Sequence, residues 1–289
     1  MQYEISNSRL AIVINDHGAE LRSIRNTRGH EFLWQADPTY WKRSSPVLFP
    51  VVGQFREGSF EWKGRTYKMG QHGFARDSDF TLISKDDSKI KFSLKSSEKT
   101  HELYPFDFEL IISYELTDST IKVSWEVVNT DRETIYFSIG AHPAFYCPYD
   151  QTDSTAKISF DNKNDLHYQL INEHGLCKDD VYSLKTDDGI WTFDNSVFDN
   201  DALIFPDCQA NEIALLKADG TPYLKVKFRT PVFGIWSPVK KNAPFVCIEP
   251  WYGRCDSAVR ALPLDRREYG NSLAVGATFK ADYEITILE

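Results

Sequence analysis

Two histidines and one glutamate are the residues of this sequence best suited to move protons. His72 lies between glycines in the string 70–76 (GQHGFAR), so little side-chain bulk covers its imidazole. His142 ends a strand-like run before a proline, and Glu249 ends the apolar run 245–248 (FVCI) in the same way. Carboxylates and imidazoles exchange protons readily, and an apolar surround raises the proton affinity of a carboxylate. The sequence therefore predicts that the three side chains converge on one polar cleft.

Each of these residues also has a structural interpretation. A single histidine in such a setting is more often a hydrogen-bonded structural group, and Glu249 could be neutralised by a salt bridge to Arg56 or Arg254. A metal site is a further alternative, with four possible ligands: His72, His142, Asp201 and Glu249. Because these four are dispersed along the chain with no local ligand spacing, we expect no metal.

One arginine and two tryptophans could bind a ligand in this cleft. Arg56 ends the string 49–56 (FPVVGQFR), and its guanidinium presents donors suited to sugar hydroxyls, a carboxylate or a phosphate. The alternative is an arginine at a strand end with its head in solvent. Trp236 and Trp251 could stack on the apolar face of a sugar, although core packing explains them equally. Four other cations could lie near the cleft but are expected to be solvated, namely Arg76, Lys240, Lys241 and Arg254.

Strands must position these strings, because alternation of apolar and polar residues dominates the sequence. The pattern is clear in residues 89–95, 120–127 and 223–228, where every second residue is apolar. Two short runs separated by Lys63-Gly64 predict a tight hairpin over residues 60–67. These segments indicate sequential antiparallel pairing.

Helix is expected only in short pieces such as residues 37–41, because no long segment has a sustained 3.6-residue apolar period. Covering the apolar faces of so many strands requires two stacked sheets or a closed barrel. We predict an all-β fold, a large antiparallel β-sandwich, in a single domain over residues 1–289. Its concave face and rim loops are the expected ligand site.

Composition narrows the classes of partner. The chain is 42% hydrophobic and carries 33 Lys plus Arg against 42 Asp plus Glu, a net charge of −9, so nucleic acid is an unexpected partner. No apolar run is long enough to span a bilayer, and the first residues lack the pattern of a signal peptide. The five cysteines include no Cys-x-x-Cys pair, which favours reduced thiols and a cytoplasmic location.

Taken in order, these strings resemble those of the aldose 1-epimerase (galactose mutarotase) family. The resemblance is stronger to the divergent branch of this family that includes hexose-6-phosphate mutarotases and LacX-type proteins. It covers nearly the whole chain. The matching strings are His-Gly-Phe (72–74), Gly-Ala-His-Pro-Ala-Phe (140–145) and Glu-Pro-Trp (249–251), supported by Gly-Ala-Glu-Leu (18–21), Tyr-Pro-Phe (104–106) and Asn-Asp-Ala (200–202). Their order and spacing make the match fairly specific.

The resemblance implies a supersandwich that interconverts α and β anomers of a hexose or hexose phosphate without a cofactor. Carried over by position, Glu249 would be the general base, His142 the general acid, and His72 a second hydrogen-bonding group at the ring oxygen. Arg56 and Asp201 would hold sugar hydroxyls. The chain has Gly-Ala-His-Pro (140–143) where galactose mutarotases have Asn-His-x-Tyr-Phe-Asn, which leaves the substrate open.

Anomer interconversion needs one proton removed from the anomeric hydroxyl and one delivered to the ring oxygen. In the simplest account Glu249 is ionised at neutral pH, and a neighbouring acid keeps His142 protonated. The competing interpretation is a non-catalytic sugar sensor with the same cleft. The simultaneous presence of a candidate acid and a candidate base favours the enzyme.

Overall fold

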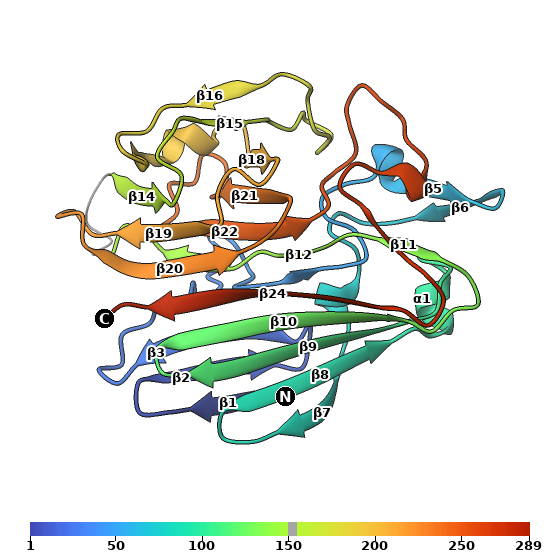
Figure 1. Cartoon of the computed structure of the whole chain (residues 1–289), viewed down its shortest axis with the longest axis horizontal. Helices are drawn as coiled ribbons and strands as arrows, with labels where there is room; N and C mark the ends of the chain where they lie inside the picture. The colour runs from blue at the N-terminus through green and yellow to red at the C-terminus, as the bar shows by residue number, and fades with distance from the viewer. Residues whose placement is uncertain (150–154) are drawn as a thin grey trace.

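The computed structural model describes residues 1–149 and 155–289, and antiparallel strands dominate it (Figure 1). The largest element is a nine-stranded sheet. In order across the sheet, its strands are β17 (Ile190–Phe193), β14 (Ala156–Phe160), β19 (Glu212–Leu216), β20 (Pro222–Phe228), β24 (Thr278–Ile287), β10 (Thr120–Asn129), β9 (Phe108–Thr117), β8 (Lys89–Lys95) and β7 (Thr81–Lys85).

Two smaller sheets pack against this large one. The six-stranded sheet contains β18 (Leu203–Pro206), β21 (Val232–Trp236), β22 (Phe245–Tyr252), β12 (Ile139–Ala141) and β4 (Val47–Leu48) in order, with β13 (Ala144–Tyr146) also paired to β22. The three-stranded sheet is β1 (Gln2–Ser6), β2 (Leu10–Asn15) and β3 (Glu20–Asn26). Phe233 of β21 contacts Phe228 of β20 with ring centroids 5.5 Å apart, and Tyr3 of β1 contacts Phe92 of β8 at 5.6 Å. The predicted large antiparallel β-sandwich is confirmed.

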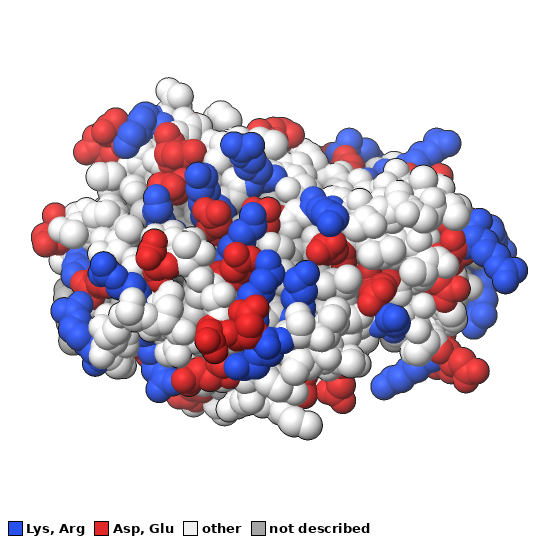
Figure 2. All heavy atoms as spheres, turned by 60° about the horizontal axis from the view of Figure 1, so that its bottom comes forward, with Lys and Arg blue, Asp and Glu red and all other residues white. Residues whose placement is uncertain are grey.

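Alternation in β10 shows why these segments form half-buried strands. Ile121, Val123, Trp125 and Val127 are buried, whereas the intervening residues point outward. On that outer face, cross-strand ion pairs join Lys122 to Asp282 at 3.2 Å and Glu126 to Lys280 at 2.8 Å. Figure 2 shows basic and acidic side chains interspersed over one face of the molecule. Such cross-strand pairs stabilise the exposed face of the sheet, while the apolar side chains of the opposite face form the core.

The central strand β22 differs, because all its residues except the last are buried. Val246 and Ile248 join the main hydrophobic core, whereas Phe245 and Cys247 lie in a smaller cluster on the other face. Loops cover that second face. Glu249 continues the row of Phe245 and Cys247, so the strand delivers a carboxylate into a covered space.

Short elements complete the fold. The predicted hairpin is confirmed as β5 (Ser59–Trp62) and β6 (Arg65–Lys68), with positive φ at Lys63 (49°) and Gly64 (77°). The other two-stranded pairs are β11 (Ile135–Phe137) with β23 (Asn271–Leu273), and β15 (Leu166–Tyr168) with β16 (Tyr182–Leu184).

The predicted helix at residues 37–41 is wrong, because Asp37 forms a single turn there by accepting the backbone N–H groups of Tyr40 and Trp41. The helical elements are α1 (Glu98–His101) and the 3₁₀ turns η1 (Arg56–Gly58), η2 (Ala75–Asp77), η3 (Asn195–Phe198) and η4 (Leu264–Arg266). Within residues 1–149 and 155–289, no helix combines the length and apolar character that a membrane crossing requires.

Candidate active site

A cavity of about 200 Å³ opens on the covered face of the six-stranded sheet. Its position follows from the strand order, because β18, β21, β22 and β12 are neighbours in the sheet. Each of these strands contributes a lining side chain from within the strand or directly after it: Ile204, Trp236, Glu249 and His142. The cavity is lined by Trp41, Val52, Gly53, Gln71, His72, Arg76, His142, Ile171, Gly175, Asp201, Ala202, Ile204, Trp236, Glu249, Trp251 and Cys255. Five of the six sequence-predicted site residues are in this set.

Glu249 contributes a deeply buried carboxyl group, with 1% of its surface exposed. It pairs with Gly234 of β21, and Oε2 has no hydrogen-bond partner among the described residues. Burial raises the pKa of this carboxyl well above its ordinary value, and Asp201 raises it further, while the Trp251 indole opposes the change. Burial therefore favours the neutral carboxyl of Glu249 over the carboxylate.

His142 lies directly after β12, where Pro143 follows the strand. Its Nε2 is 3.3 Å from Glu249 Oε2, and its ring stacks on Trp41 with centroids 4.8 Å apart. Burial lowers the pKa of His142 to about 3, with a contribution from the positive charge of Arg76. The alternative salt bridge from Glu249 to Arg56 or Arg254 is absent among the described residues, and His142 takes that place.

These two shifts correct the protonation states expected from the sequence. An ionised Glu249 beside a protonated His142 and a neutral carboxyl beside a neutral imidazole contain the same number of protons. Burial penalises charge, so these surroundings favour the neutral arrangement. The pair holds one transferable proton in either case.

His72 approaches His142 edge-on, with ring centroids 5.7 Å apart. Its Nδ1 accepts the Gly53 N–H at 3.1 Å, which leaves Nε2 as the protonated nitrogen of a neutral ring. His72 has a positive φ of 65°, and a Cβ on Gly73 would lie 2.2 Å from the carbonyl oxygen of Phe49. Because Gly73 has no Cβ, its backbone can approach the backbone of Phe49 closely, and this contact fixes the position of the neighbouring imidazole.

Asp201 and Trp236 complete the group that the sequence predicted. Asp201 precedes β18, and burial raises the pKa of its carboxyl, while the Ala202 N–H that it accepts at 2.7 Å acts in the opposite direction. Trp236 ends β21 and meets His142 edge-on with centroids 5.2 Å apart. Together these residues add an acceptor and an aromatic wall to the cavity.

Arg56 does not join the cavity. Its guanidinium donates to the carbonyl oxygen of Ser257 at 2.7 Å, and its backbone N–H donates to Asp256 at 2.9 Å. The cation in the cavity is Arg76, which donates to the Gln71 carbonyl at 2.6 Å and whose pKa falls to about 10 because it is buried. The expectation that Arg76 is solvated was wrong, although its place four residues after His72 in one string was an available signal.

The four-residue metal alternative does not assemble as a single site. Within residues 1–149 and 155–289, the donor atoms that gather within 4.8 Å belong to His142, Cys247 and Glu249. Burial raises the pKa of the Cys247 thiol well above its ordinary value, as it does for the Glu249 carboxyl. A cation would have to displace both protons, so this geometry favours proton transfer over metal binding.

Sequence reasoning missed the residues that close the cavity from outside the sheet. Trp41 ends the segment 37–41 that was predicted to be a helix, and Ile171 and Gly175 come from an irregular loop. Neither segment has a period that would reveal its orientation, so only the tertiary fold brings them over Glu249.

Comparison with known proteins decides the family. The model of the aldose 1-epimerase family matches residues 1–275. The chain belongs to this family. It is 30% identical to the plasmid-encoded protein LacX of Lactococcus lactis subsp. lactis over the full length of both chains. It is also 26% identical to a putative glucose-6-phosphate 1-epimerase of Escherichia coli (strain K12), over 61% of this chain and 54% of that protein.

Solved structures agree with this assignment. A galactose mutarotase related enzyme from Lactobacillus acidophilus superposes with a TM-score of 0.94 and 33% identity, covering 100% of this chain and 98% of that one. A galactose mutarotase-like protein from Lactobacillus casei gives a TM-score of 0.91 and 28% identity, with 99% and 100% coverage. The family resemblance predicted from the sequence is thus confirmed, and the protein is an isomerase of the aldose 1-epimerase type.

Proposed function

We propose that this isomerase interconverts the α and β anomers of a hexose or hexose phosphate, with Glu249 and His142 as its proton-transfer pair. The observation that carries the assignment is the 3.3 Å separation of His142 Nε2 and Glu249 Oε2 in the wall of one cavity. Binding alone does not require an acid and a base in contact, which is why we favour turnover over a sugar sensor.

Ring opening uses both members of the pair at once. In the ion-pair form, which is reached when the proton of Glu249 moves to His142, ionised Glu249 takes the proton of the anomeric hydroxyl. The bond between C1 and the ring oxygen breaks as protonated His142 donates a proton to that oxygen. The open-chain aldehyde then coexists with a neutral carboxyl and a neutral imidazole, the arrangement that burial favours. After rotation about the C1–C2 bond, closure on the other face returns both protons.

Other lining residues have supporting roles in this proposal. His72 donates from Nε2 to the ring oxygen, and Asp201 accepts a sugar hydroxyl. Trp236 offers an aromatic face or edge to the ring carbons. We propose Arg76, in place of Arg56, as the cation that binds either a hydroxyl or a phosphate, because it lines the cavity and Arg56 does not.

The test is an anomer-equilibration panel. Fresh α-glucose, α-galactose and their 6-phosphates are followed by NMR or polarimetry with and without the purified protein. We expect acceleration with at least one of these sugars. Wild-type protein that binds the sugars without accelerating any of them would instead make the chain a sensor.

Two further proposals concern the whole chain. We propose that residues 1–289 form a single domain, because one continuous core cluster includes Ile5 of β1 and Ile287 of β24. A cytoplasmic location is supported by five unpaired cysteines, four of them buried.

A further inference from the structure

The indole ring of Trp251 lies over the sheet beside Glu249. Both residues belong to β22 and are two positions apart, so their side chains leave the same face of the strand, and both line the cavity. Gly140 of β12 pairs with Trp251, and Gly234 of β21 pairs with Glu249. A Cβ on Gly140 would lie 2.6 Å from the indole Cδ1, and a Cβ on Gly234 would lie 2.7 Å from Cζ2. The ring fits there because both neighbouring strands carry glycine at these positions.

The same two glycines fix the direction of the indole N–H. Cδ1, Nε1, Cε2 and Cζ2 form one continuous edge of an indole, and the two ends of this edge lie over Gly140 and Gly234. Since Gly234 is the cross-strand partner of Glu249, the edge that carries the N–H runs toward the row of Glu249 in the sheet. The donor is therefore directed to the side of the ring on which the carboxyl lies.

This N–H is a buried donor without a partner. Trp251 is 5% exposed, and its Nε1 forms no hydrogen bond with any residue that the structure describes, as is also true of Glu249 Oε2. A buried polar group that stays unpaired costs free energy, so such groups call for an explanation. Here an unpaired donor and an unpaired acceptor belong to neighbouring side chains in the wall of one cavity.

Trp251 affects the proton affinity of Glu249 in the opposite direction to the other surroundings. Burial raises the pKa of Glu249 most and Asp201 raises it further, whereas the Trp251 indole lowers it. A hydrogen-bond donor favours the charged form of a carboxyl. Ring opening begins from the ion-pair form of Glu249 and His142, so a donor to the carboxylate makes that form more accessible.

We infer that Trp251 is a positioning residue, whose indole N–H donates to the Glu249 carboxylate in the ion-pair form. This inference rests on the proposed function. In the neutral form the N–H and Oε2 stay unpaired. When the proton of Glu249 moves to His142, the carboxylate gains a donor and the N–H gains an acceptor. The hydrogen bond offsets part of the cost of the buried charge and orients the carboxylate toward the anomeric hydroxyl.

The test compares Trp251→Phe, which removes the N–H and retains an aromatic ring, with the wild-type protein. We expect kcat/KM for the sugar that the wild-type protein accelerates most to fall about tenfold, the loss of one hydrogen bond to a charged group. The alkaline limb of the pH profile of kcat/KM should also move to higher pH, because Glu249 then loses the last proton of the pair less readily.

Trp62→Phe is the matched control. Trp62 Nε1 is also buried and unpaired among the described residues, but Trp62 does not line the cavity. We expect this variant to keep the wild-type kcat/KM and the wild-type pH profile. A general effect of losing a buried indole N–H would appear in both variants.

A second readout follows the Glu249 carboxyl directly, because other charged or titratable groups act on the pair or lie beside it. These groups are His72, Arg43, Arg76, Asp201, Cys247 and Cys255. Carbon-13 NMR of protein labelled at the glutamate carboxyls, with Glu249→Gln to assign the signal, measures its titration. The titration should move to higher pH in Trp251→Phe and stay unchanged in Trp62→Phe.

Every outcome bears on the inference. A loss of rate with an unmoved alkaline limb and an unmoved carboxyl titration would show that Trp251 only packs, and a wild-type kcat/KM in Trp251→Phe would equally overturn its role. If Trp251→Phe does not fold, the indole is replaced by benzothiophene, which has nearly the same shape and no N–H, and the same criteria apply. If the wild-type protein accelerates no sugar, the proposed function fails, and the carboxyl titration separately decides whether the N–H stabilises the charged form of Glu249.

Discussion

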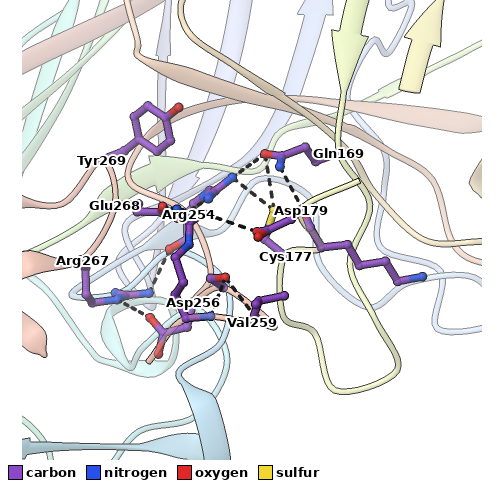
Figure 3. Close-up of polar contacts among 12 residues, drawn as sticks. Gln169, Cys177, Asp179, Arg254, Asp256, Val259, Arg267, Glu268 and Tyr269 are labelled. Atoms are coloured by element: carbon purple, nitrogen blue, oxygen red, sulfur yellow. Dashed lines mark hydrogen bonds and ion pairs between the residues drawn. The ribbon is translucent and has the colours of Figure 1, made fainter. Parts of the chain in front are cut away.

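Two buried polar groups of this protein are satisfied in opposite ways. Arg254 has both terminal guanidinium nitrogens occupied, by Gln169 and Cys177 on one side and Glu268 on the other (Figure 3). Glu249 and His142 are also buried, yet Glu249 Oε2 and His142 Nδ1 have no hydrogen-bond partner among the described residues. A guanidinium bonded at both terminal nitrogens stabilises structure, whereas unused hydrogen-bonding capacity in the wall of a cavity is available to a ligand.

We expect the largest effect when Glu249 or His142, the pair with unused hydrogen-bonding capacity, is replaced. Glu249→Gln and His142→Asn should each reduce the rate of anomer equilibration by about 10²–10⁴-fold, because each removes one positioned acid/base group. NMR exchange rates, corrected for the spontaneous reaction, measure the loss. The double variant should equilibrate anomers at about the rate of the less active single variant, since the two groups act as a unit. A single variant with the wild-type rate would refute the pair.

Replacing Arg254 should affect the stability of the fold and not the proton-transfer reaction. Arg254→Met removes the partner of Gln169 and Cys177 and should cost about 3 kcal/mol, the low end for a broken buried ion pair. The low end applies because Glu268 keeps a second partner, Arg260, at 2.9 Å. The midpoint of urea unfolding measures the change, and Lys63→Met, at an exposed ion pair, is the control. Equal midpoints for the two variants would contradict the structural role of Arg254.

The pH dependence of stability should sharpen the same contrast. The pKa of Glu249 is raised in the folded state. Below its unfolded-state pKa, near 4.5, the carboxyl is protonated in both states and does not affect the free energy of unfolding. As the pH rises above that pKa, the carboxyl ionises more readily in the unfolded state and so destabilises the fold. Glu249→Gln should therefore raise Tm at pH 8 and leave it nearly unchanged at pH 4. Thermal unfolding at both pH values tests this expectation. A lower Tm at pH 8 would mean that the carboxylate is stabilised by its surroundings.

The smallest effect concerns the auxiliary histidine. His72→Asn should lower the rate of anomer equilibration about tenfold, because one hydrogen-bond donor near the ring oxygen is displaced. Its Tm should fall modestly, since the Gly53 N–H loses its acceptor at 3.1 Å. A loss as large as that of Glu249→Gln would exchange the roles of His72 and His142.

Much of the fold followed from local pattern. The alternation in residues 120–127 predicted the buried face of β10, and the glycine turn predicted the hairpin of β5 and β6. Residues 37–41 misled because a proline and an aspartate begin helices and isolated turns alike. The choice between them depends on what the segment packs against, and here Trp41 packs on His142.

Electrostatics was the least predictable property. Arg56 and Arg76 follow similar strings, yet Arg56 bonds to Ser257 and Arg76 lines the cavity. Burial shifts the pKa of Glu249 upward and that of His142 downward, away from the expected ion pair, because a pKa depends on burial by loops distant in the chain. Local sequence contains no measure of that burial.

By itself, the sequence determined which residues alternate across the sheets, which strings interrupt them, and therefore the family and the identities of His72, His142 and Glu249. These features are local, since the period of a strand and the freedom of a glycine act over a few residues. The tertiary structure alone decided that Arg76 and not Arg56 faces the cavity, that Arg254 anchors the loop 169–178, and that the Trp251 indole lies over Gly140 and Gly234. These features arise from contacts between segments far apart in the chain, where packing sets both geometry and proton affinity.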